Sequence, residues 1–134
     1  DVARRPIRLA GWLPTPECLK QLEACDLGYL PYWLNRGEWV EQCFPSKLTS
    51  YVAAGIPVLV HAPLQSTPAR FLSQYPLGIC CPSLDSGDIR AALEHLLQPE
   101  AYAQYARQAH RAAVEQLNLE EFQCRVRRLL GSLR

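Results

Sequence analysis

Residues 44–60 constrain the fold of this chain more than any other stretch, because they predict a loop, a short helix and a buried strand in immediate succession. A proline turn closes the loop, and the hydroxyl of Ser46 is suited to cap the first turn of the helix. Gly55 supplies the left-handed residue that commonly ends a helix, and Pro57 prevents its continuation. The apolar run that follows Pro57 is typical of a buried strand.

The alternation of strand and helix recurs on both sides of this segment. Apolar runs predict four short strands, at residues 7–13, 27–31, 57–60 and 77–82. Helical patterns separate them, and the last helix is expected over residues 119–134. Such alternation predicts an α/β fold with one parallel, Rossmann-like sheet, flanking helices and two or three C-terminal helices. Without an internal repeat or a linker, we interpret residues 1–134 as a single domain.

The composition excludes several function classes. Hydrophobic residues make up 49% of the chain and charged residues 20%, as in an ordinary soluble globular domain. A formal net charge of +1 gives no reason to expect nucleic acid or an anionic membrane as a partner. No apolar run approaches the roughly 20 residues of a transmembrane segment. The chain contains no methionine, so we expect it to be part of a longer protein.

The six cysteines show no metal-binding pattern. They form no Cys-x-x-Cys pair, and none has a histidine at the spacing of a zinc site. The neighbours Cys80 and Cys81 are poorly placed for a mutual disulfide. We interpret the cysteines as reduced core residues, which predicts a cytoplasmic protein without a metal centre.

The start of the predicted helix at Ser46 is suited to bind phosphate. Unpaired amides and the positive end of the helix dipole lie there beside Lys47. Lys20 and Lys47 are the only lysines of the chain, and a compact ammonium at a helix start fits a point-charge contact with phosphate. The alternative is a core helix that simply begins with a solvated lysine.

A resemblance to a known family rests on two adjacent motifs, Phe44-Pro45-Ser46-Lys47-Leu48 and Tyr51-Val52-Ala53-Ala54-Gly55-Ile56-Pro57-Val58. Together they resemble the C-terminal domain of GT-B glycosyltransferases, in particular the large retaining family known as glycosyl transferases group 1, or family 4. The resemblance covers residues 5–115 and only the later part of that nucleotide-sugar-binding domain. It implies that the N-terminal acceptor domain, which would complete the enzyme, is missing from this chain.

The same resemblance implies which residues contact the donor. Lys47 would be the catalytic residue, because its ammonium and the nearby amides would stabilise negative charge on the departing diphosphate. The donor diphosphate and ribose would be bound by Phe44, Pro45, Ser46, Lys47, Leu48 and Ser50. The nucleotide base would be bound by the turn of Trp12, Leu13 and Pro14, although Trp12 is equally suited to plug the end of the sheet. No cofactor or metal is implied, since the nucleotide-diphosphate sugar is itself the donor substrate.

Three further residues are possible ligands. Many family members carry glutamates on both sides of the proline turn, but Gln42 and Ser50 occupy the matching positions here and are uncharged. Arg36 belongs to a loop of about a dozen residues, a length typical of functional loops. His61 follows the third predicted strand, at the edge where open α/β sheets bind ligands. Arg36 has a plainer alternative as a solvated surface residue, and His61 has one as a loop residue.

These patterns predict the donor-binding part of a glycosyltransferase that takes sugar from a nucleotide-diphosphate sugar. We expect this part to be inactive alone, because the acceptor domain is absent. One alternative keeps the scaffold and changes the reaction, to that of a sugar-nucleotide epimerase or a glycan phosphorylase. Another is a non-catalytic α/β interaction module. Unpaired sheet edges would also favour self-association.

Overall fold

A computed structural model of the chain describes residues 8–32 and 39–131. Its sheet is parallel, with the strand order β1-β2-β3, and consists of β1 (Gly28–Pro31), β2 (Val58–His61) and β3 (Gly78–Cys80). Helices alternate with these strands and follow the last of them. The predicted α/β class and the parallel sheet are therefore confirmed.

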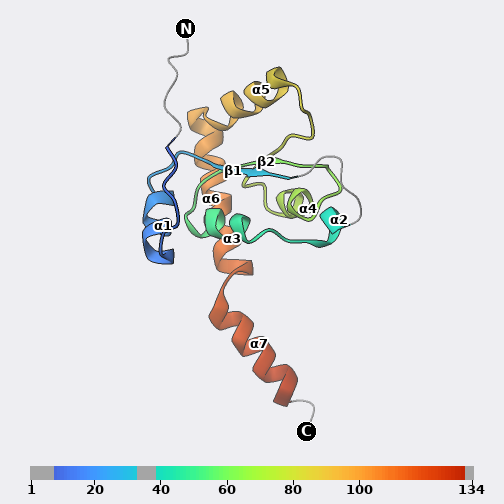
Figure 1. Cartoon of the computed structure of the whole chain (residues 1–134). Helices are drawn as coiled ribbons and strands as arrows, with labels where there is room; N and C mark the ends of the chain where they lie inside the picture. The colour runs from blue at the N-terminus through green and yellow to red at the C-terminus, as the bar shows by residue number, and fades with distance from the viewer. Residues whose placement is uncertain (1–7, 33–38, 132–134) are drawn as a thin grey trace.

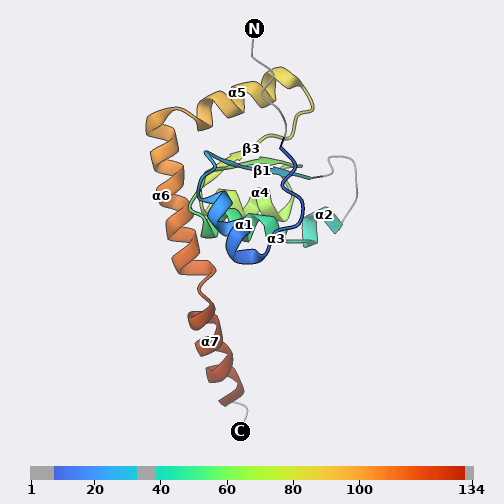
Figure 2. The ribbon, with the colours of Figure 1, turned by 60° about the vertical axis from the view of Figure 1, so that its left-hand side comes forward.

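Helices cover both faces of the sheet (Figure 1). The helix α5 (Ser86–Leu96) lies over one face, and α3 (Ser46–Ala53) and α4 (Thr67–Gln74) lie under the other. The long helix α6 (Pro99–Gln116) runs along one side, as Figure 2 shows, and contacts both α3 and α5. The other described helices are α1 (Thr15–Leu22), α2 (Trp39–Gln42) and α7 (Leu119–Gly131).

The alternation of side chains along the strands divides the core into two clusters. On the face covered by α3 and α4, the fully or nearly buried residues include Leu30, Leu48, Val52, Val58, Val60 and Leu72. On the face covered by α5, the buried residues are Leu59, Cys81 and Leu96. The segment 44–60 contributes to both clusters, so its early prediction as a helix followed by a buried strand is confirmed. Gly55 has φ 69°, the left-handed conformation expected after the helix.

The strand predicted over residues 7–13 is wrong for the described residues 8–13, which form no strand. The sheet therefore has three described strands and not four. Leu9 is 91% exposed and Trp12 is 87% exposed. Within the described residues, β1 pairs only with β2, so its other edge stays open and residues 8–13 do not pair with it. Gly11, at φ 71°, also interrupts the extended backbone that a strand requires.

All six cysteines are free thiols, and their environments differ from the prediction. Cys81 is buried and Cys80 is partly buried, as expected of core residues. Cys18, Cys25 and Cys43 are exposed instead. Cys18 lies on α1 and Cys25 lies shortly after it, and α1 has no buried residue. The prediction that these cysteines belong to the core is therefore wrong.

Three helices follow the last strand, as predicted, and α7 extends away from the rest of the molecule (Figure 1). The side chain of Asn118 caps it, because its Oδ1 accepts hydrogen bonds from the amides of Glu120 and Glu121 at 3.0 and 3.2 Å. Among the described residues, no helix is long and apolar enough to cross a membrane.

Candidate functional site

The proline turn before α3 is held between the end of β1 and the start of α4. The carbonyl oxygen of Cys43 accepts a hydrogen bond from the hydroxyl of Tyr32 at 2.8 Å and another from Oγ1 of Thr67 at 2.7 Å. Burial, with a smaller contribution from Cys43, raises the pKa of Tyr32, so its hydroxyl keeps the proton that it donates. Two loops that follow neighbouring strands are thereby joined at one edge of the sheet.

The structure corrects the role of Ser46 at the start of α3. Ser46 is the first residue of the helix, and the cap position belongs to Pro45, which makes no side-chain cap bond. The amide of Leu48 donates to the Pro45 carbonyl at 3.0 Å, whereas no described residue accepts from the amides of Ser46 and Lys47. The helix therefore begins with unpaired donors, which leaves more amide groups available to an anion than a capped start would.

Lys47 lies on the first turn of α3 and is exposed. Within residues 8–32 and 39–131, its ammonium has no ion-pair partner. Lys47 and the unpaired amides therefore share the first turn of α3. The phosphate contact at this turn stays a prediction.

Of the other residues predicted to bind the sugar donor, some are exposed and others are buried in the core. Phe44 is 41% exposed, and its ring packs edge-on against Phe71 with 5.3 Å between centroids. The side chain of Leu48 is fully buried and belongs to the core. Ser50 is half-buried, with its hydroxyl 3.5 Å from the Ser46 carbonyl oxygen. The turn thus presents Phe44, Ser46 and Lys47 to solvent, while Leu48 anchors the helix beneath them.

The predicted base-binding turn of Trp12, Leu13 and Pro14 directly precedes α1. Its chain leads into α1, at the left of the sheet in Figure 1, whereas α2 lies at the right. The exposure of Trp12 also excludes the alternative that it plugs the sheet end. Gln42, the last residue of α2, is exposed, and Arg36 lies outside the described residues.

His61 lies at the carboxyl end of β2 as predicted, but both of its ring nitrogens are engaged. Nε2 is 2.8 Å from the carbonyl oxygen of Ser83, and Nδ1 is 2.7 Å from the hydroxyl of Tyr29. A carbonyl can only accept, so Nε2 carries the proton in the neutral ring and Nδ1 accepts from Tyr29. With 9% of its surface exposed, His61 fixes the strand end in place and offers no free nitrogen to a ligand.

Sequence reasoning missed Arg70 on α4. Its guanidinium donates to the Gln65 carbonyl at 2.9 Å and to the Glu41 carbonyl, which ties α2 to the start of α4. Next to it lies an open cavity of about 250 Å³, lined by Phe44, Thr67, Arg70, Phe71 and Gln74. No sequence signal marked Arg70, because its acceptors are backbone carbonyls in two other segments. No group of side chains in the described residues is suited to hold a metal ion.

Together these features form an anion-favouring edge. The helices α3 and α4 begin after neighbouring parallel strands, so both of their positive ends lie at the carboxyl edge of the sheet. The chain matches no family model, no curated protein and no solved structure.

Proposed function

We propose that this chain is the donor-binding part of a glycosyltransferase that uses a nucleotide-diphosphate sugar. The observation that carries the proposal is the start of α3, where the unpaired amides of Ser46 and Lys47 lie beside an exposed and unneutralised lysine. A diphosphate fits such a place because each phosphate accepts several hydrogen bonds and carries negative charge.

The surroundings of the turn favour a nucleotide ligand over a free phosphate ion. The turn is fixed on both sides by the hydroxyls of Tyr32 and Thr67, so its amides are already oriented before a ligand binds. The exposed ring of Phe44 adds an apolar surface beside the polar one. The position, at the carboxyl edge of a parallel sheet, is the one at which open α/β folds bind nucleotides.

In the proposed reaction, the chain's own groups act on the leaving group. The ammonium of Lys47 and the helix amides would stabilise the charge that develops on the diphosphate as the sugar departs. The proposed role does not include binding of the sugar acceptor. We therefore expect the 134-residue chain to bind the donor without transferring sugar. The same donor site would serve an epimerase or a phosphorylase, which product analysis of the complete enzyme would distinguish.

The test is a titration of the chain with uridine and guanosine diphosphates, followed by amide chemical shifts. Uridine and guanosine themselves serve as matched ligands that lack the diphosphate. We expect one of the diphosphates to shift the Ser46 and Lys47 amide signals, and the nucleosides to leave them in place. Lys47→Ala should weaken binding about tenfold, the effect of losing one charge-assisted hydrogen bond.

Lys20→Ala is the matched control, because Lys20 is the other lysine of the chain and lies exposed on α1. It should bind the diphosphate as the unmodified chain does. If both substitutions weakened diphosphate binding equally, the cause would be the change in net charge, and the assigned site would be wrong. Absence of binding to any nucleoside diphosphate would favour the non-catalytic interaction module instead.

A further inference from the structure

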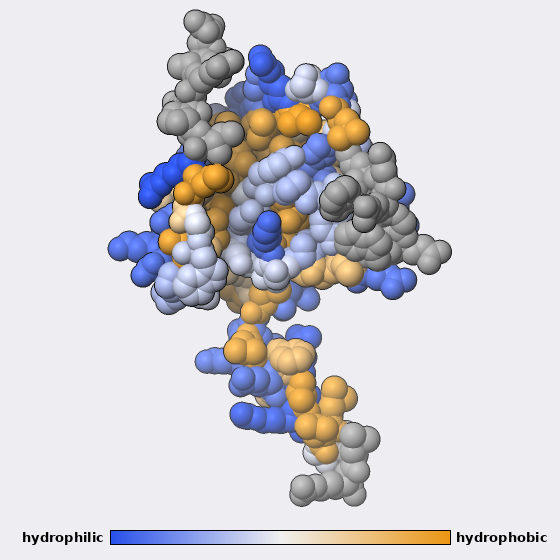
Figure 3. Space-filling view, in the orientation of Figure 1, coloured by the Kyte–Doolittle hydropathy of each residue, from blue (hydrophilic) through white to orange (hydrophobic). Residues whose placement is uncertain are grey.

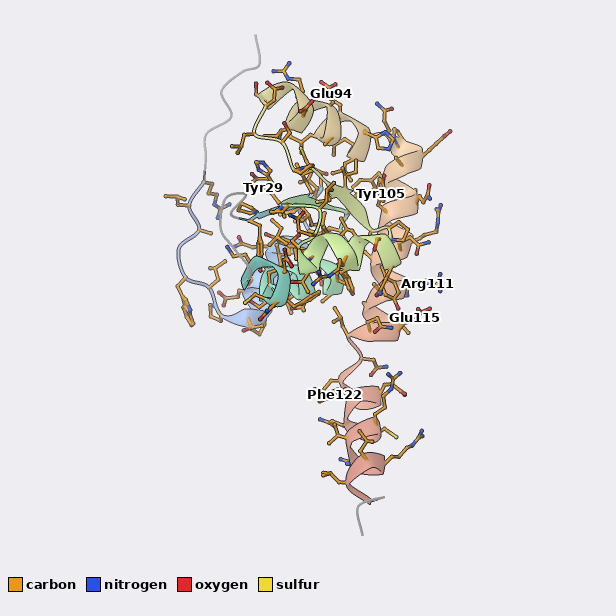
Figure 4. The ribbon with its side chains drawn as sticks, turned by 90° about the vertical axis from the view of Figure 1, so that its right-hand side faces the viewer. Tyr29, Glu94, Tyr105, Arg111, Glu115 and Phe122 are labelled. Carbon is orange, nitrogen blue, oxygen red and sulfur yellow. The ribbon has the colours of Figure 1, made fainter. Side chains whose placement is uncertain are left out.

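The cavity of about 250 Å³ beside the proline turn is lined mainly by one face of α4. Thr67, Arg70, Phe71 and Gln74 follow one another at helical spacing, and Phe44 lines the cavity from the turn. Figure 1 shows α2 at the right of α4, and Figure 4 looks onto this side of the molecule. Drug-sized ligands occupy clefts of about 300–1,000 Å³, so this cavity suits a part of a ligand, such as one sugar ring.

Arg70 gives the cavity a positive charge that is held in place. Its guanidinium donates to the carbonyl oxygens of Gln65, at 2.9 Å, and of Glu41. These acceptors are uncharged, and within residues 8–32 and 39–131 no carboxylate forms an ion pair with Arg70. A guanidinium has five N–H donors, so these two bonds leave others for a ligand. Carboxylate and phosphate groups match the guanidinium best, and the cavity therefore favours a ligand that carries one of them.

The rest of the cavity combines an apolar wall with a polar group. The ring of Phe44 is 41% exposed and is held edge-on against Phe71. The face of an aromatic ring attracts positively polarised groups, such as the C–H groups of a sugar. The side-chain amide of Gln74 is exposed and has no partner in the described part of the chain, so it is available to a hydroxyl. In Figure 3, hydrophobic and hydrophilic residues likewise lie side by side at the lower right of the body.

The cavity adjoins the proposed diphosphate contact. Phe44 lies two residues before Ser46, so their Cα atoms are at most about 7 Å apart. Thr67, which also lines the cavity, donates to the Cys43 carbonyl of the same turn at 2.7 Å. A sugar attached to a diphosphate at the start of α3 would therefore lie within reach of the cavity. Because the phosphates are then bound at α3, the group left to pair with Arg70 is a carboxylate.

We propose that the cavity binds the sugar of the donor, and that this sugar is a uronic acid. The inference rests on the proposed donor site at α3. The carboxylate at C6 of the sugar pairs with Arg70, a C–H face of the ring packs on Phe44, and a hydroxyl bonds to Gln74. The donors that fit are nucleotide-diphosphate uronates.

The charge of Arg70 selects a uronate over two other occupants. A nucleobase such as uracil or guanine is uncharged, so it would leave the guanidinium without an anion. A neutral hexose would use the aromatic wall and the amide of Gln74 but has the same shortcoming. Only the uronate uses all three features of the cavity.

The test is calorimetric titration of the 134-residue chain with two matched pairs of donors. One pair is uridine diphosphate glucuronate and uridine diphosphate glucose, and the other is guanosine diphosphate mannuronate and guanosine diphosphate mannose. Within each pair, only C6 differs, as a carboxylate or a hydroxymethyl group. In the pair whose base the chain accepts, the uronate should bind about tenfold more tightly, the effect of one charge-assisted hydrogen bond.

Substitutions of Gln74 change the charge of the cavity and leave the hydrogen bonds of Arg70 in place. Gln74→Glu should abolish the preference for the uronate, and Gln74→Lys should increase it several-fold. Ser73→Glu is the matched control, because Ser73 is exposed on the same helix but does not line the cavity. It adds the same charge as Gln74→Glu and should leave most of the preference.

Arg70→Gln should bring the tenfold preference close to one and leave the affinity for uridine diphosphate itself unchanged. Arg70 also ties α2 to α4, so circular dichroism would show whether this variant is folded. Arg70→Lys retains the charge and should keep part of the preference. The Gln74 variants decide the question even if Arg70→Gln does not fold.

Three outcomes would overturn the inference. Equal affinity for both members of each pair would remove the uronate from the cavity, while the proposed donor site would stand. A loss of affinity for uridine diphosphate in Arg70→Gln, as large as the loss for the uronate, would assign Arg70 to the diphosphate. If no nucleotide bound at all, the donor site and this inference would both be wrong.

Discussion

The Tyr29 hydroxyl lies 2.7 Å from Nδ1 of His61, which joins β1 to the end of β2 through side chains. The backbone also pairs at this strand end, because the amide of Tyr32 donates to the His61 carbonyl at 2.8 Å. The side-chain hydrogen bond therefore adds a second connection between the two strands. The second nitrogen of His61 extends this connection to the Ser83 carbonyl, ahead of α5.

Tyr29→Phe should lower the free energy of unfolding by about 1 kcal/mol, the value of one hydrogen bond at a partly exposed site. His61→Ala should cost more, about 2 to 3 kcal/mol, because it removes both bonds and leaves a gap at the strand end. Urea unfolding measures both. Tyr102→Phe, on α6, is the control and should change little; a Tyr29→Phe effect no larger than this one would show that the bond adds no stability.

Gly78→Ala should be among the most destabilising single substitutions in the chain. A Cβ at this position would lie 1.9 Å from the backbone oxygen of Val58, so β2 and β3 would have to separate. The expected loss is about 3 kcal/mol or more, and thermal unfolding would measure it. Gly131→Ala makes a matched control, because a Cβ there meets nothing within 4 Å. A similar loss for both variants would contradict the steric cause.

Stability should fall as the solution becomes alkaline. Burial raises the pKa of Cys80 and of Tyr51, so the folded protein holds these protons after the unfolded chain has lost them. Their contribution is complete below the unfolded pKa, and it is lost as pH rises above about 8.5 for the thiol and about 10 for the phenol.

Cys80 alone should contribute a slope of less than about 1.4 kcal/mol per pH unit, since its side chain is only partly buried. Chemical denaturation at several pH values gives the slope, and Cys80→Ala should reduce it. Stability that rose between pH 8.5 and 10 would contradict the assigned direction.

Asp85→Ala should destabilise α5 by about 1 kcal/mol, because the Asp85 carboxylate caps the helix. It accepts hydrogen bonds from the amides of Gly87 at 2.8 Å and Asp88 at 3.2 Å. Amide exchange of the first turn of α5 would speed up accordingly. Asp85→Asn retains a capping oxygen and should lose much less, so equal losses for the two variants would exclude capping as the cause.

The sequence-based prediction succeeded where short-range signals agree. The helix ending at Gly55 and the buried strand after Pro57 form as expected, because the turn residues, the spacing of apolar residues and the length all favour the same structure. The position of Lys47 on an exposed helix start follows from the same local signals.

The prediction failed where structure depends on distant partners. The apolar run before Pro14 has the composition of a strand, but strands form only by pairing, and its sequence holds no information on a partner. His61 was placed correctly at a strand end, yet its partners Tyr29 and Ser83 come from segments remote in sequence. The cap was assigned to Ser46, one residue too late, because the proline turn closes directly before the helix and Pro45 holds the cap position.

The double hydrogen bond on the Cys43 carbonyl has a mechanical consequence. Since Tyr32 and Thr67 both hold this one oxygen, the turn before α3 moves only if the end of β1 and the first residue of α4 move with it. A ligand bound at Lys47, as proposed, would therefore meet a turn that two hydrogen bonds already hold in place. Binding should then occur in a single kinetic phase, because the turn does not rearrange first. Any displacement of the turn should be transmitted to α4.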